Sequence, residues 1–109
     1  MKPLFISDLD GTLLNERGEL DTETIRLVRR LSAAGHWFSV ATARSIASAG
    51  KILEQLELHI PVVLMNGVLL YDPEARECVH VEPIPPKAAA RAMDVFERGG
   101  RLPYCFSFD

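Results

Sequence analysis

The sequence predicts an α/β protein built on a parallel sheet, and three observations support this prediction. Short apolar runs predict β-strands at residues 4–7, 37–41 and 62–65. Apolar side chains at helical spacing predict helices in the intervening segments, residues 22–34 and 45–56. Strands that alternate with helices of this length run parallel through right-handed crossovers. The first half of the chain is therefore predicted to form a doubly wound, Rossmann-like unit with helices on both faces of its sheet.

Boundary residues support the first strand and helix. The run at residues 4–7 is predicted to be a buried strand, because acidic and glycine residues follow it directly. Asp21 or Thr22 is suited to cap the next helix, since a short polar side chain can accept hydrogen bonds from the first helical turn. Gly35 is a natural terminator for that helix.

The second helix and third strand also have clear limits. Ser45 or a neighbouring residue is predicted to start the helix, and Pro61 ends the connection before the third strand. The aromatic side chains of Trp37, Phe38 and Phe96 are predicted to belong to the core.

The pattern changes after the third strand. Residues 68–71 and 78–81 are apolar runs separated by a turn at residues 72–75, which predicts an antiparallel hairpin. Cys78 and Cys105 lie far apart without metal-ligand spacing, and we interpret them as buried or idle thiols in a reducing compartment.

Prolines in residues 82–86 predict a domain boundary there. This boundary divides the chain into residues 1–82, the sheet unit with its hairpin, and residues 83–109. The second unit is predicted to contain a helix at residues 87–98, which ends at two glycines, and a strand at residues 102–108.

Composition limits the possible partners. The 109 residues are 48% hydrophobic and 25% charged, which is typical of one ordinary globular unit. The net charge of -3 gives no electrostatic reason to expect nucleic acid or an anionic membrane as a partner. The apolar run before Asp8 is too short for a signal peptide, and no stretch approaches membrane-spanning length, so we expect a cytoplasmic protein.

The most informative motif is the carboxylate pair Asp8 and Asp10, which directly follows the first strand. Side chains at i and i+2 of a strand point the same way, so the two carboxylates are expected to converge. Gly11 then allows a sharp turn. Two close carboxylates repel, and they stay ionised only if a cation neutralises them or one of them takes a proton. Both outcomes suit catalysis.

A solvated turn or the opening of a calcium loop is the alternative for this motif. A calcium loop needs further oxygen ligands at alternate positions, and it follows a helix. Here Leu13 and Leu14 are apolar, and a strand is predicted before Asp8. The residues therefore favour the catalytic interpretation.

Polar residues also follow the second and third strands, at the edge where open parallel sheets bind ligands. Thr42 could hold a phosphate oxygen or cap the helix that starts near Ser45. Arg44 could reach a substrate or pair with a surface acid. Asn66 and Gly67 could contact a ligand or simply form a turn.

Three segments together resemble the haloacid dehalogenase superfamily of phosphotransferases. Asp-Leu-Asp-Gly-Thr-Leu at residues 8–13 resembles its first motif, and residues 38–44, which end in Thr-Ala-Arg, resemble its second. The Asn-Gly at the end of residues 63–67 resembles a signature of the Cof-like sugar-phosphatase branch, which includes sucrose-phosphate phosphatase. That branch commonly has Thr-Gly-Arg in the second motif, so Ala43 is a minor departure.

The resemblance implies a fold and a reaction. It implies a parallel core sheet with an α/β cap inserted after the third strand, so residues 83–109 would begin that cap. It implies a phosphomonoester hydrolase in which Asp8 is the nucleophile and a Mg²⁺ ligand. Asp10 would be the general acid and base, and would also bind Mg²⁺ through its backbone carbonyl. Thr42, Arg44, Asn66 and Gly67 would bind the phosphate ester, with a sugar phosphate as the expected substrate.

The family's third and fourth motifs, a lysine and a second acidic group, have no counterpart in the chain. Relative to the family the chain is therefore expected to be truncated. This leaves two alternatives to a hydrolase: a non-catalytic fragment or remnant of such an enzyme, and a phosphomutase. It also predicts that the edge of the strand at residues 4–7 is bare, which favours self-association.

Overall fold

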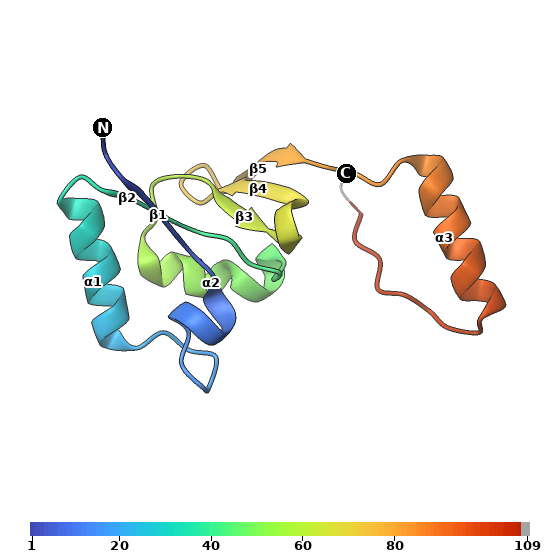
Figure 1. The fold of residues 1–109 in the computed structure, drawn as a ribbon, viewed down its shortest axis with the longest axis horizontal. Coiled ribbons are helices and arrows are strands. Elements are labelled where there is room, and N and C mark those ends of the chain that lie inside the picture. Colours follow the sequence, from blue (N-terminus) through green and yellow to red (C-terminus); the bar gives the residue numbers. More distant parts are fainter. Residues whose placement is uncertain (108–109) are drawn as a thin grey trace.

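The computed structural model describes residues 1–107 and consists of an α/β body from which a helix projects (Figure 1). The elements in chain order are β1 (Leu4–Ser7), α1 (Thr22–Ala33), β2 (Trp37–Val40), α2 (Ile46–Leu56), β3 (Val62–Leu64), β4 (Leu69–Asp72), β5 (Glu77–Val81) and α3 (Pro86–Arg98). All of the predicted helices form, and each predicted strand forms except the last.

The strands confirm the predicted parallel arrangement. β1 and β2 pair in parallel, with Leu4 opposite Trp37. A parallel bridge between Ala41 and Val63 continues this pairing to β3. β3, β4 and β5 then form an antiparallel sheet, so the predicted hairpin is confirmed. The carboxyl ends of the three parallel strands consequently lie at one edge.

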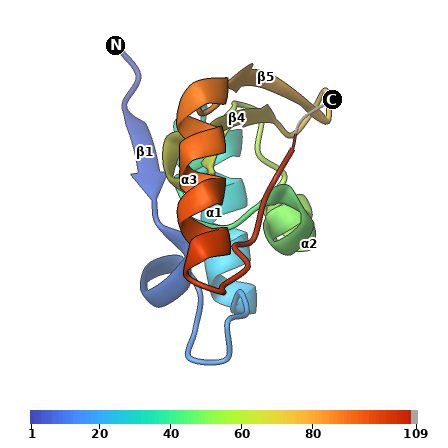
Figure 2. The same cartoon turned by 90° about the vertical axis from the view of Figure 1, so that its right-hand side faces the viewer.

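The two helices of the parallel unit lie on one face of the sheet rather than on both. α1 and α2 contact each other, and Arg29 of α1 donates a 2.8 Å hydrogen bond to the Gln55 carbonyl of α2. In Figure 2 both helices lie on the same side of β1. The reason is topological: β1, β2 and β3 follow one another in a single direction across the sheet. Right-handed crossovers in one direction place both connecting helices on the same face.

The core lies between this face and the two helices. Its fully buried side chains come from the turn after β1, from β2 and β3, and from α2: Leu9, Val40, Leu56, Val62 and Leu64. Phe38 belongs to this core, as predicted. Trp37 does not, because it lies on the opposite face of β2 and is 45% exposed.

β1 is exposed, which corrects the prediction of a buried strand. Leu4 and Ile6 are 53% and 57% exposed. Among residues 1–107, β1 pairs only with β2, and no helix covers its second face. An apolar strand is buried only where other elements supply the cover.

α3 stands apart from the α/β body (Figure 1). Pro86 occupies its first turn, where the missing N–H costs nothing, and Gly100, with φ of +65°, follows its end. No side chain of α3 is buried, so Phe96 at 40% exposure is not the core residue that was predicted.

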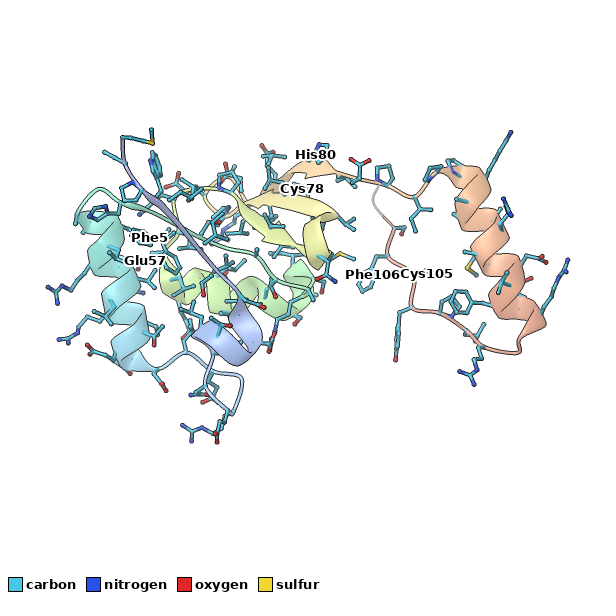
Figure 3. All side chains as sticks on the ribbon, in the orientation of Figure 1. Phe5, Glu57, Cys78, His80, Cys105 and Phe106 are labelled. Carbon is cyan, nitrogen blue, oxygen red and sulfur yellow. The ribbon has the colours of Figure 1, made fainter. Side chains whose placement is uncertain are left out.

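The segment after α3 does not form the predicted strand. Residues 102–107 have no regular secondary structure, and residue 108 lies outside the described residues. A strand needs a partner for its backbone groups, and residues 1–107 supply none to this segment. Cys105 and Phe106 lie on it (Figure 3), and they help line an open, largely apolar cavity of about 750 Å³ that faces α3 and the end of β5.

The remaining predictions concern thiols and membranes. Cys78 and Cys105 are exposed free cysteines on separate parts of the molecule (Figure 3), so neither is the buried thiol that was one of the two expectations. That they are idle stays a prediction. No helix among residues 1–107 combines the length and the apolar character needed to cross a bilayer.

Candidate active site

The first segment of the site is the turn after β1. Asp8 is extended, and its Oδ1 accepts a 2.7 Å hydrogen bond from the Leu9 N–H. The turn Leu9–Leu13 closes when the Leu14 N–H donates to the Leu9 carbonyl at 2.9 Å, and Leu9 itself is fully buried. Gly11 has φ of +74°, which confirms the sharp turn expected there. The buried Leu9 thus anchors two exposed carboxylates, Asp8 and Asp10.

The second segment follows β2 and centres on Thr42, which is 4% exposed. Its backbone N–H donates to the Val63 carbonyl at 3.0 Å, and its hydroxyl oxygen accepts a 3.1 Å hydrogen bond from the Arg44 N–H. The residue that caps α2 is Ser45. Thr42 therefore orders the loop before the helix rather than capping the helix itself.

The third segment is the turn Met65–Gly67, which replaces the last residue predicted for β3. Met65, Asn66 and Gly67 have φ of 51°, 56° and 96°. Met65 carries a side chain that disfavours a positive φ, whereas asparagine and glycine tolerate it, and the strain at Met65 persists only where surrounding contacts enforce it. Here the Met65 N–H donates to the Arg44 carbonyl and the Asn66 N–H donates to the Thr42 carbonyl.

The three segments surround one open cavity of about 420 Å³. It is lined by Asp8, Asp10, Thr42, Asn66 and Gly67, together with Ala41, Ala43 and Val63. Five of the six predicted site residues therefore share a cavity at the carboxyl ends of the parallel strands, where open α/β sheets bind ligands. Asp8 and Asp10 both line this cavity, although β1 ends at Ser7 and the strand that was expected to aim them the same way does not reach them.

The sixth residue, Arg44, is not part of the cavity lining and pairs with Asp10. Its Nε lies 2.7 Å from Asp10 Oδ2, and its Nη2 lies 2.8 Å from Asp10 Oδ1. The hydrogen bonds from Arg44 hold the pKa of the Asp10 carboxyl below its usual range, and the charge of Arg44 adds to this effect. The same hydrogen bonds raise the pKa of Arg44.

This pairing is opposite to what a general acid requires. The acid and base role predicts surroundings that raise the pKa of Asp10, so that the carboxyl can carry a proton. The bidentate ion pair instead stabilises the ionised form and occupies both carboxylate oxygens. In this arrangement Asp10 is not ready to donate a proton.

The residues fit a hard cation such as Mg²⁺ in part. The exposed Asp8 carboxylate has two oxygens and accepts a hydrogen bond from Leu9, which leaves acceptor capacity for a metal. The Asp10 carboxylate is held by Arg44, so from Asp10 the backbone carbonyl is the expected ligand. No group of three His, Cys, Asp or Glu side chains comes together within residues 1–107. The described chain thus offers part of a Mg²⁺ ligand set.

Two residues of the site were not anticipated from the sequence. The Arg44 Nη1 lies 3.3 Å from the Ser48 Oγ, so Ser48 takes part in holding the guanidinium. Their i,i+4 spacing at the start of a predicted helix is a signal that could have identified this contact. The positive φ of Met65 has no such signal, because methionine has no preference for that conformation.

Comparisons with known proteins identify related sequences and structures. The model of the haloacid dehalogenase-like hydrolase family matches residues 5–108. The 5-amino-6-(5-phospho-D-ribitylamino)uracil phosphatase YitU of Bacillus subtilis is 35% identical over 74 residues, which are 67% of this chain and 27% of that protein. The pyridoxal phosphate phosphatase YbhA of Escherichia coli is 30% identical over 88 residues, which are 81% of this chain and 32% of that protein. The chain thus spans a third or less of the length of these relatives.

Solved structures share the fold. A haloacid dehalogenase-like hydrolase from B. subtilis superposes with a TM-score of 0.76 at 30% identity, over 90% of this chain and 34% of that one. The TM0651 protein of Thermotoga maritima superposes with a TM-score of 0.75 at 28% identity, over 90% of this chain and 36% of that one. With a family match along nearly its whole length, the chain belongs to the haloacid dehalogenase-like hydrolases.

Proposed function

We propose that the chain contributes the nucleophile and the phosphate-binding residues of a Mg²⁺-dependent phosphomonoester hydrolase. The observation that carries this proposal is the shared cavity of Asp8, Asp10, Thr42, Asn66 and Gly67 at the carboxyl ends of the parallel strands. The phosphatase names of relatives that cover most of the chain support the same reaction class.

In the proposed reaction Asp8 attacks the phosphorus atom of the ester, and the bond from phosphorus to the leaving oxygen breaks. For this step Asp10 has to leave Arg44 and take up a proton from solvent, which it then gives to the leaving oxygen. It later takes a proton from the water that hydrolyses the aspartyl phosphate. The buried Thr42 and the Met65–Gly67 turn hold the phosphate against Asp8. Bound Mg²⁺ would offset the repulsion between the phosphate dianion and the nucleophile.

We further propose a small phosphorylated metabolite as the substrate, with a sugar phosphate as the first class to test. The two named relatives act on phosphate esters of quite different organic groups, which supports the phosphate as the common element. Residues 83–109 would begin a cap over the cavity, since α3 stands clear of the body and buries none of its side chains. Specificity would then come from that cap.

The test is phosphate release from a panel of sugar phosphates, with and without Mg²⁺, by the 109-residue chain and by Asp8→Asn. We expect release that requires Mg²⁺ and falls at least about a hundredfold in Asp8→Asn, because the nucleophile is lost. Asp94→Asn is the matched control, since Asp94 pairs with Arg98 on α3, away from the cavity. Equal release by the chain and by Asp8→Asn would contradict the proposed mechanism.

One observation favours a second candidate, a non-catalytic chain that binds Mg²⁺ or phosphate weakly. Within residues 1–107 the only acidic side chains lining the cavity are Asp8 and Asp10, and Asp10 is paired with Arg44. Loss of preorganised electrostatic groups costs orders of magnitude in rate. Mg²⁺ binding by calorimetry, lost in Asp8→Asn and without phosphate release from any substrate, would support this second candidate.

A further inference from the structure

Each of the three guanidinium nitrogens of Arg44 donates to an acceptor of the protein. Nε and Nη2 donate to the two oxygens of Asp10 at 2.7 and 2.8 Å. Nη1 donates to the Ser48 hydroxyl at 3.3 Å and lies 3.4 Å from the Ser48 carbonyl oxygen. The Arg44 side chain is 26% exposed and that of Asp10 is 56% exposed, so the pair lies at the surface where an anion can reach it.

The backbone of Arg44 is fixed on both sides. Its N–H donates to the Thr42 hydroxyl at 3.1 Å, and its carbonyl accepts from the Met65 N–H at 3.0 Å. Both contacts belong to segments that line the cavity. A change of partner at the guanidinium therefore needs only side-chain rotation, which takes place without moving the loop.

We propose that Arg44 is an anion-operated latch on Asp10: its guanidinium holds the Asp10 carboxylate in the free chain, and a phosphate group entering the cavity takes over the guanidinium and releases Asp10. This inference rests on the proposed function for the identity of the anion. It makes Arg44 a positioning residue, which acts through Asp10 until the phosphate arrives.

The chemistry of the two anions supports the exchange. The planar fork of a guanidinium matches a carboxylate and a phosphate equally in geometry, so the two compete for the same donors. A phosphate dianion carries more charge and more acceptor oxygens than a carboxylate. The exchange would couple substrate arrival to the freeing of Asp10, and such coupling is reciprocal: removing Asp10 must strengthen phosphate binding.

The first test is a double-mutant cycle on the affinity for inorganic phosphate, measured by calorimetry in the absence of Mg²⁺. Asp10→Asn and Asp8→Asn remove the same charge from the same cavity, but only Asp10 competes for Arg44. We expect Asp10→Asn to bind phosphate about three- to fivefold more tightly than Asp8→Asn does, in line with the strength of an exposed ion pair. In an Arg44→Gln background this difference should vanish. An equal difference in both backgrounds, or no difference in either, overturns the latch.

The second test uses the unaltered chain, so it does not depend on variants that fold. The Nε–Hε signal of Arg44 in NMR spectra reports on its hydrogen-bond partner. We expect this signal to shift as inorganic phosphate saturates the site, and Arg26, which pairs with Glu23 on α1, provides the internal control signal that stays in place. Saturation with phosphate that leaves the Arg44 signal unchanged, or the absence of any phosphate-dependent change, overturns the proposal.

These tests separate the latch from the proposed function. Phosphate coupling between Asp10 and Arg44 without phosphate release from any ester would support the latch and contradict the hydrolase proposal for this chain. Phosphate release that requires Mg²⁺ and Asp8, without coupling between Asp10 and Arg44, would support the hydrolase proposal and contradict the latch.

Discussion

At the scale of single residues, Arg44 connects the three segments of the cavity. Its side chain holds Asp10 from the first turn, its N–H binds Thr42, and its carbonyl binds Met65. One residue therefore contacts all three segments. Arg44 is therefore part of the site, although a pairing with a surface acid alone would not have placed it there.

Glu57, at the end of α2, has a strained backbone conformation, as Met65 does (Figure 3). Its φ is 52°, in the left-handed region that glycine adopts without strain. We expect Glu57→Gly to be more stable than Glu57→Ala by about 1 kcal/mol in urea unfolding, because only glycine relieves this conformation. Both variants lose the pairing of Glu57 with Arg29, so the comparison isolates the backbone. Equal stability of the two variants would show that the conformation carries no strain.

Leu56 is the buried residue whose loss should cost most on α2, because its side chain is fully enclosed. We expect Leu56→Ala to lower the free energy of unfolding by about 2–5 kcal/mol, through lost burial and the cavity left behind. Leu27→Ala on α1 is the matched control, since Leu27 is largely exposed and its loss should cost much less. A similar loss in free energy of unfolding for the two variants would show that Leu56 is not a core residue.

At the scale of elements, the strands bring the segments of the site together, and the short turns after them carry most of its residues. β1, β2 and β3 bring three chain segments to one edge. The turns Leu9–Leu13 and Met65–Gly67 then aim the chain into the cavity. The strands therefore fix where the cavity lies, and the turns supply most of the polar residues that line it.

α3 buries none of its side chains and stands apart from the α/β body. We expect a shortened chain of residues 1–82 to unfold within about 0.5 kcal/mol of the 109-residue chain in urea, since the removed part contributes little to the core. The Leu56→Ala variant, measured in the same assay, shows how far the free energy of unfolding falls when a core side chain is lost. A drop of that size in the shortened chain would show that α3 and the following segment stabilise the body.

At the scale of the whole molecule, the chain leaves one apolar face of its sheet uncovered. The described residues extend over 53 × 31 × 22 Å, with α3 at one end. Leu4, Ile6 and Trp37 share the exposed face of β1 and β2, and β1 has a free edge among residues 1–107. Such an edge is a template for another strand.

We expect the 109-residue chain to self-associate at micromolar concentration, as measured by light scattering. Ile6→Lys should shift it toward the monomer, because a charge on an edge strand opposes pairing. Val95→Lys is the control, since Val95 is also well exposed, at 68% against 57% for Ile6, but lies on α3. A monodisperse monomer for the unaltered chain would contradict this prediction.

The sequence by itself determined the α/β class, the order of the elements and the segments of the site. Periodicity and turn residues are local signals, so the helices, the hairpin and the helix ends at Ser45 and Gly35 could be predicted. The Asp8 and Asp10 pair could be placed at the end of a strand for the same reason. Its position beside Thr42 and Asn66 followed from the rule for the ends of parallel strands.

Only the tertiary structure decided which side chains meet and which surfaces are covered. It paired Arg44 with Asp10, which lie 34 residues apart, and so lowered the pKa of a carboxyl that needs a raised pKa for the role of general acid. It placed α1 and α2 on one face and left β1 exposed, and it left residues 102–107 without a strand partner. These outcomes depend on contacts between distant segments, and a local pattern does not contain the identity of its partner.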